Sequence, residues 1–143
     1  APLLEGLVHH LAGDPQAALA SFGSARELLE AELERNPDDH RIHAALGLAE
    51  AGLGRGPEAV RHAERAVELY PLEADALGAP VQVVNLALVH ALLGDGEAAA
   101  RHLREVLAIP STMSAAWLEK DPRWDAVRSS DAFMNLLVEF GER

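Results

Sequence analysis

The stretch LGRGPEAVRHAERAVELYP, residues 53–71, decides the fold, because LGDGEAAARHLREVLAIP, residues 93–110, follows the same pattern forty residues later. In both stretches one helical pattern ends at a glycine, and a second pattern runs from there to a proline. Gly13 marks a third copy, since it lies 41 residues before Gly54, which in turn lies 40 residues before Gly94. A fixed period of this length indicates stacked helical repeats.

Small or apolar residues recur at matched places around these glycines. In the first helix of each unit the place is held by Gly6, Gly47 or Ala87. A small side chain there lets two antiparallel helices pack closely, and a glycine at the turn can take the left-handed conformation that closes a helix. In the second helices the matched residues are Ala18, Ala59 and Ala99, then Phe22, Ala63 and Leu103, then Ala25, Ala66 and Val106.

Start and stop signals set the bounds of six helices. Asp14 and Asp95 stand where a side chain can cap the second helix of the first and third units. Pro37, Pro71 and Pro110 follow the second helices and stop them. The sequence therefore predicts helices over residues 2–12, 15–35, 39–53, 57–70, 80–93 and 96–108, with a short extra turn in residues 72–78.

Composition narrows the class of protein. The chain has 143 residues, is rich in alanine and leucine, and shows no run with the period-two alternation of strands. It contains no cysteine, which excludes disulfides and thiolate metal sites. A formal charge of −11 without a basic stripe argues against nucleic-acid binding. There is neither a secretion leader nor a membrane-spanning run, so we expect a cytoplasmic protein that contacts no nucleic acid and no membrane.

The second unit resembles a tetratricopeptide repeat, whose pattern has a small residue in the first helix, alanines in the second and a closing proline. The resemblance covers residues 3–110, although Ala63 departs from it because the family prefers an aromatic residue there. It implies an all-α, right-handed superhelix of about three helix pairs, with units near residues 1–37, 38–78 and 79–110. The residues that carry the resemblance are Leu46, Gly47, Ala59, Ala66 and Pro71.

Residues 111–143 break the repeat and contain most of the aromatic side chains. The last repeat of an array leaves one apolar face open, and a cap must cover it. We therefore expect C-terminal capping helices that begin at Ser111, at Asp121 and at Ser129 or Ser130. The residues expected to bury against the last repeat are Trp117, Trp124, Val127, Phe133, Leu136 and Leu137.

The tail also resembles the end of tetratricopeptide arrays in large bacterial regulators. In those proteins the array is joined to a protein kinase, an adenylate cyclase or a DNA-binding domain. The resemblance implies a C-terminal regulatory or dimerising arm of a longer signalling protein, and a chain that starts at Ala1 without a methionine fits that hypothesis. The matching residues are Pro110, Ser111, Asp121, Pro122, Trp124, Asp125, Arg128, Phe133 and Leu137.

Stacked helix pairs present a concave face lined by the first helices. The family's groove positions are mostly apolar in this chain, and such a face needs a cover, which could be a protein or peptide partner, a second copy in a homodimer, or the chain's own tail. Relatives clamp a peptide carboxylate with Lys, Arg and Asn, but only Arg41 and Asn85 could serve here, so we expect no such clamp. The predicted partner-binding residues are Leu7, His10, Arg41, Ala44, Ala45, Leu48, Val84, Asn85 and Leu88, flanked by Leu4, Leu11, Val81 and Leu92.

Candidate catalytic and metal-ligating residues are few. His40 and His43 could bring two imidazoles to one face, but the sequence places no third ligand beside them. Asp14, near His9 and His10, is better explained as a helix cap than as the partner of a general base. No nucleophile, base and oxyanion-binding group occur together. We therefore expect a non-catalytic binding module without a cofactor, with a metal-dependent enzyme as the most distant alternative.

Overall fold

The computed structural model describes residues 1–74, 79–109 and 114–141. Within these ranges the chain is all-α, as predicted, and contains no strand. The array consists of α1 (Pro2–Leu11), α2 (Pro15–Arg35), α3 (His40–Gly52), α4 (Gly56–Leu69), α5 (Pro80–Leu92) and α6 (Gly96–Leu107), with a 3₁₀ turn η1 (Leu72–Ala74) after α4, and the tail adds α7 (Ala115–Lys120), the 3₁₀ turn η2 (Pro122–Trp124) and α8 (Asp131–Phe140).

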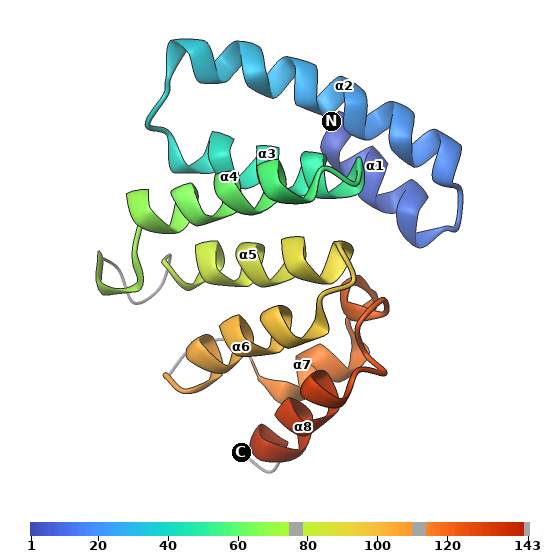
Figure 1. The fold of residues 1–143 in the computed structure, drawn as a ribbon, viewed down its shortest axis with the longest axis vertical. Coiled ribbons are helices and arrows are strands. Elements are labelled where there is room, and N and C mark those ends of the chain that lie inside the picture. Colours follow the sequence, from blue (N-terminus) through green and yellow to red (C-terminus); the bar gives the residue numbers. More distant parts are fainter. Residues whose placement is uncertain (75–78, 110–113, 142–143) are drawn as a thin grey trace.

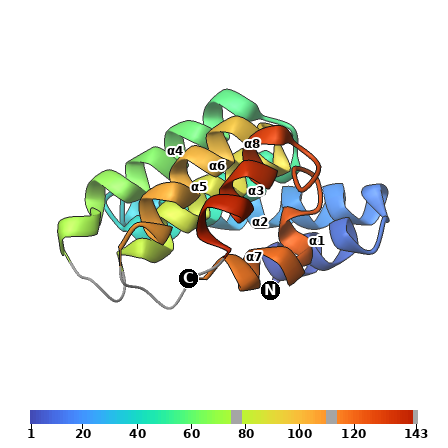
Figure 2. The same cartoon turned by 90° about the horizontal axis from the view of Figure 1, so that it is seen from below.

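The helices form antiparallel pairs that stack one below the other (Figure 1). The pairs are α1 with α2, α3 with α4, and α5 with α6, and the first helix of each later pair also packs against the pair before it. Figure 2 shows α4 and α6 on one side of the stack and α1 on the opposite side. The tail continues the stack, since α8 packs against α6 and η2 reaches α5.

Local signals in the sequence explain where the helices begin and end. All six predicted array helices agree with the structure to within one residue at each end. The Asp14 carboxylate accepts a hydrogen bond from the Ala17 amide, and Asp95 accepts one from the Ala98 amide, as expected of N-caps. The turns close through three glycines with positive φ, namely Gly13 (77°), Gly54 (76°) and Gly94 (81°).

Close backbone contact joins the two helices of a pair. A Cβ atom added at Gly47 would lie 3.1 Å from the Ala59 carbonyl oxygen and 3.2 Å from the Ala63 Cβ. A larger side chain at position 63, where the family prefers an aromatic residue, would not fit against Gly47 at this distance. In the first unit the matched position holds an aromatic residue, Phe22, whose side chain is fully buried.

Phe22 is enclosed by two glycines from different units. A Cβ at Gly6 on α1 would lie 2.7 Å from the Phe22 ring, and a Cβ at Gly52 on α3 would also collide with the ring. The ring therefore fills space that only glycine leaves free on both sides. Gly52 was not among the matched positions of the sequence pattern, because its contact depends on how the second unit stacks on the first.

Most of the tail residues predicted to be buried are buried, with one error. Trp124, Phe133 and Leu136 are fully buried against the last pair, and Val127 is buried beside them. The prediction that Trp117 is buried is wrong, since its side chain is 68% exposed. On the short helix α7 the inward positions are taken by Ala115 and Leu118, which leaves Trp117 facing outward, while Leu137 of α8 is half-buried.

Serine and aspartate side chains begin the tail elements. Ser130 accepts a hydrogen bond from the Phe133 amide and starts α8, and Asp121 accepts one from the Arg123 amide and starts η2. Ser114 caps α7. The predicted cap at Ser111 and the stop at Pro110 lie outside the described residues, as do residues 75–78 of the predicted extra turn.

We predict that Gly52→Ala destabilises the fold, because the new methyl group must displace the enclosed Phe22 ring. Overpacking of this kind costs about 1–3 kcal/mol, which urea unfolding followed by circular dichroism would detect as a lower midpoint. Gly23→Ala is the matched control, since a Cβ at this helical glycine meets nothing within 4 Å. The control should be neutral or more stable by up to about 1 kcal/mol. Equal stability of the two variants would contradict the enclosed position of Phe22.

Candidate partner-binding face

The predicted face follows the first helices of the three units, α1, α3 and α5. Figures 1 and 2 show α7 beyond α5, on the same side of the stack as α1 and opposite α4 and α6. The predicted residues differ widely in exposure, because the tail and the neighbouring units cover them unequally. Arg41 and His10 are exposed, Leu88 is buried, and the half-buried residues are Leu7, Ala44, Ala45, Leu48, Val84 and Asn85.

Asn85 bridges two units. Its Nδ2 donates a hydrogen bond to the Ala44 carbonyl oxygen at 3.2 Å, across 41 residues of sequence. The amide thus ties α5 to α3 near the middle of the predicted face. Only part of its hydrogen-bonding capacity remains for a guest, because one of its two N–H donors is already engaged.

Arg41 is held at the start of α3 by its own helix cap. Its Nη2 lies 2.9 Å from the Asp39 Oδ2, and its backbone amide donates to the Asp39 Oδ1 at 2.9 Å. These hydrogen bonds lower the pKa of Asp39 to about 2, so the pair remains charged across the physiological range. Arg41 therefore belongs to an exposed ion pair and brings little net positive charge to the face.

The tail covers the end of the face on α5. Leu88 is only 3% exposed and lies in one cluster with Leu118 and Trp124 of the tail, although its equivalents Leu7 and Leu48 are half-buried. In this structure Leu88 therefore offers no open surface to a guest. The sequence left open whether the tail fills the face, and the structure shows that it covers this part of α5.

Arg128 holds the covering segment in place. Its guanidinium donates to the carbonyl oxygens of Leu118 at 2.8 Å, Glu119 at 2.6 Å and Asp121 at 2.6 Å, and its Nε lies 3.2 Å from the Asp125 Oδ1. These carbonyl groups end α7 and have no partner within the helix. A single side chain thus satisfies the C-terminus of α7 and ties it to the segment that follows η2.

Large apolar side chains are exposed along α1 and at the start of α5. Leu4 is 63% exposed, Val81 is 60% exposed, and Val8 and Leu11 are also exposed. Trp117 on α7 extends this series beyond α5 and lines a shallow hollow together with Lys120 and Pro122. An outward tryptophan was not expected from the sequence, because the aromatic residues of the tail were all assigned to its core.

A buried polar network joins the helices of the second unit. His43 Nε2 lies 2.8 Å from the Pro37 carbonyl oxygen, and its Nδ1 lies 3.1 Å from His62 Nδ1. His62 Nε2 lies 3.5 Å from the buried Glu50 carboxylate, which accepts a hydrogen bond from Arg55 Nε at 3.0 Å. These groups were not singled out together from the sequence. The available signal was that Glu50 occupies the place held by His9 and His90 in the other units.

The histidines predicted as possible metal ligands point to different partners. His40 stacks on Tyr70, with ring centroids 4.7 Å apart, whereas His43 belongs to the buried network. Within residues 1–74, 79–109 and 114–141, no cluster of three or more His, Asp or Glu side chains has the geometry of a metal site. No helix in these ranges is both long and apolar enough to span a bilayer.

The tetratricopeptide repeat family matches the chain in two places, residues 20–74 and residues 80–105. The first segment contains most of α2 and all of α3 and α4, and the second contains α5 and most of α6. Together they span more than half of the chain, which therefore belongs to this family. Tetratricopeptide repeats are in general non-catalytic modules for protein–protein interaction, which makes a protein the expected class of partner. No curated protein matches the chain. The resemblance of the tail to bacterial regulators accordingly stays a prediction.

We predict that Arg128→Met loosens the tail while the array stays folded. Loss of hydrogen bonds to three carbonyl groups should cost about 1–3 kcal/mol locally. The measurement is made in a Trp117→Phe background, where Trp124 is the only tryptophan. Its fluorescence emission should shift to longer wavelength at a lower urea concentration in the Arg128→Met variant than in the protein that carries only Trp117→Phe. Arg123→Met is the control, because Arg123 hydrogen-bonds the neighbouring Asp121 carboxylate on the surface. If Trp124 unfolds at the same urea concentration in the Arg128→Met and Arg123→Met variants, Arg128 does not hold the tail in place.

Proposed function

We propose that this tetratricopeptide array binds a segment of a protein partner along α1, α3 and the start of α5. The observation that carries the proposal is the exposure of large apolar side chains on α1 and at the start of α5, with Leu4 and Val81 each at least 60% exposed. Exposed apolar groups of this size on the face that the family uses for binding favour an apolar guest.

The tail limits the length of the site. Because Leu118 and Trp124 cover Leu88, the guest contacts the first unit, the second unit and only the beginning of the third. Half-buried Ala44, Ala45 and Leu48 form the middle of the face, where small side chains allow a backbone to approach. Asn85 and His10 supply polar groups that orient the guest.

The surrounding charge restricts the guest further. The chain carries 23 acidic and 12 basic residues, yet none of the nine predicted face residues is acidic. The exposed Arg41 is neutralised by Asp39. The face is thus close to neutral within an acidic protein, which favours an apolar segment with few charges over a strongly acidic one.

The proposal predicts that charged substitutions on the face abolish peptide binding. Peptides selected from a phage-displayed library on the wild-type protein would be measured by fluorescence polarisation against Leu11→Glu and Val81→Glu. A charge placed in an apolar contact should raise Kd at least about tenfold. Val138→Glu is the control, because Val138 is 80% exposed on α8, in the tail.

Circular dichroism would verify that all three variants stay helical, and light scattering would give their mass. If every selected peptide binds the three variants equally, the proposed face is wrong. If the wild type is a dimer that Leu11→Glu and Val81→Glu convert to monomers, the face binds a second copy of the chain instead of a different protein.

A further inference from the structure

One pair of positions is filled differently in the three units. It consists of the residue three places after the matched small residue of the first helix, and the residue three places after the matched alanine of the second helix. The first unit has His9 and Ser21 there, the second has Glu50 and His62, and the third has His90 and His102. In the second and third units the two positions face each other, and they are filled by different chemistry.

In the second unit the histidine has a buried counter-ion. The Glu50 carboxylate lies 3.5 Å from His62 Nε2, and Arg55 Nε donates to the same carboxylate at 3.0 Å. Burial lowers the pKa of His62, while the charge of Glu50 opposes that shift. A proton taken up by His62 therefore creates one positive charge directly beside a negative one.

In the third unit the same positions hold two imidazoles. The rings of His90 and His102 stack with centroids 5.5 Å apart and an interplanar angle of 18°. Both side chains are largely buried, with 13% and 19% of their surface exposed. The nearest carboxylates are more exposed and more distant than Glu50 is from His62, with Asp95 at 3.9 Å from His90 and Glu105 at 3.6 Å from His102.

Burial lowers the pKa of both histidines, and the neighbouring His102 lowers that of His90 further. The charged groups that face the pair come from each adjoining element. Glu64 of α4, Asp95 of the α5–α6 turn and Glu105 of α6 oppose the shift, whereas Arg101 of α6 adds to it. These partly exposed carboxylates are screened by solvent, so they compensate less than a buried counter-ion does.

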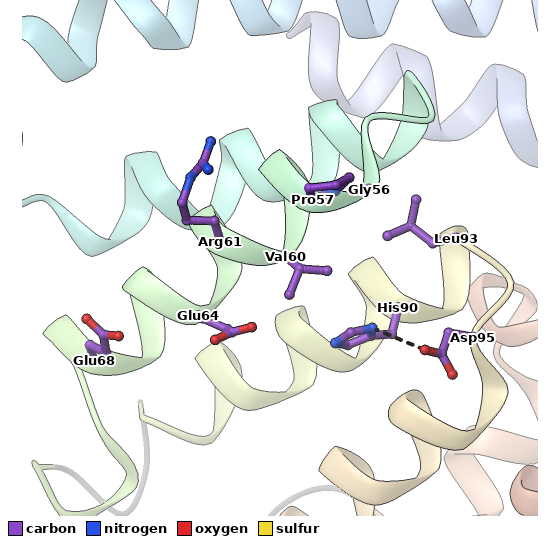
Figure 3. A pocket seen from close by; sticks show the side chains of 9 residues that line it. All are labelled: Gly56, Pro57, Val60, Arg61, Glu64, Glu68, His90, Leu93 and Asp95. Atoms are coloured by element: carbon purple, nitrogen blue, oxygen red, sulfur yellow. Dashed lines mark ion pairs between the residues drawn. The ribbon is translucent and has the colours of Figure 1, made fainter.

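Solvent has a direct route to His90. A hollow of about 590 Å³ lies between α4 and the α5–α6 turn, and His90 and Asp95 line it together with Glu64 and Val60 (Figure 3). His90 can therefore change protonation state without prior unfolding of the array.

We propose that the stacked His90–His102 pair is a pH-sensitive contact that weakens the packing of α5 against α6 in mildly acidic conditions. Protonation of both rings places two like charges in a largely buried stack. In the second unit His62 also has a histidine beside it, His43, but there the buried Glu50 carboxylate lies 3.5 Å from His62. We therefore expect the third unit to loosen in acid before the second.

The tail depends on this unit. Leu103 of α6 and Leu88 of α5 lie in one buried cluster with Trp124 and Phe133 of the tail. Separation of α5 from α6 loosens the surface on which the tail rests, and the covered Leu88 becomes accessible. The proposal does not depend on whether the neighbouring face binds a partner.

The direction of the pH effect follows from linkage. The unfolded chain takes up protons near the ordinary histidine pKa of 6.5, whereas His90 and His102 in the fold take them up only at lower pH. Their contribution to the free energy of unfolding is therefore fully present above pH 6.5. It is lost as the pH falls from 6.5 towards the pKa values of the folded state.

We predict that acid loosens the third unit before the second. Hydrogen exchange at pH 7.5 and pH 5.5, corrected for the intrinsic exchange rate, should show a greater loss of protection in α5, α6 and α8 than in α3 and α4. His90→Gln, which removes one of the two titrating rings, should reduce this loss. His10→Gln is the matched control, since His10 is exposed on α1 and should leave the pH dependence unchanged.

A second variant transfers the arrangement of the second unit to the third. In the double variant His90→Glu/Asp95→Arg, the new carboxylate faces His102 as Glu50 faces His62, and the new arginine lies beside that carboxylate as Arg55 lies beside Glu50. The acid sensitivity of the third unit should fall. If either variant fails to fold at pH 7.5, NMR titration of the wild-type histidines decides the question. His90 and His102 titrating at or above pH 6.5, or unchanged acid sensitivity in folded variants, would overturn the proposal.

Discussion

The structure depends on close contact between helix backbones, made possible by residues with little or no side chain. Gly47 against Ala59 and Ala63 sets the distance within the second pair, and Gly6 and Gly52 leave room for the ring of Phe22 between two pairs. Such contacts bury backbone and methyl surface at high packing density, so even one added methyl group is felt. The repeated small residues therefore set how closely the helices of each unit approach one another.

The same packing explains why apolar residues are covered next to the tail and exposed on α1. A helix pair buries its outer apolar surface only against a neighbour, and after α6 the neighbour is the tail, which contributes Trp124, Phe133 and Leu136. The tail covers Leu88 of α5, whereas Leu4, Val8 and Leu11 of α1 are exposed. Apolar surface that is buried at one end of the stack is thus available at the other.

The polar side chains buried between paired helices differ from unit to unit, although the helices are stacked in the same way. At one repeated pair of positions the second unit encloses an acid and a histidine, and the third encloses two histidines. We expect the two arrangements to respond differently to protons, because the carboxylate beside the histidine is buried in the second unit and about half exposed in the third. A repeat protein can therefore vary its response to pH from unit to unit while the helices keep their arrangement, since each unit contacts only its neighbours.

The sequence by itself determined the helix pairs, because caps, turn glycines and small-residue spacing are local signals within one or two turns of a helix. Asp14, Gly54 and Pro71 mark helix ends whatever lies across from them. Only the tertiary structure decided that Trp117 faces outward, that Leu88 is covered and that Asn85 bonds the Ala44 carbonyl. Those outcomes depend on how each helix is rotated about its axis relative to helices that are distant in the sequence. The residues next to a position in the sequence do not determine that rotation.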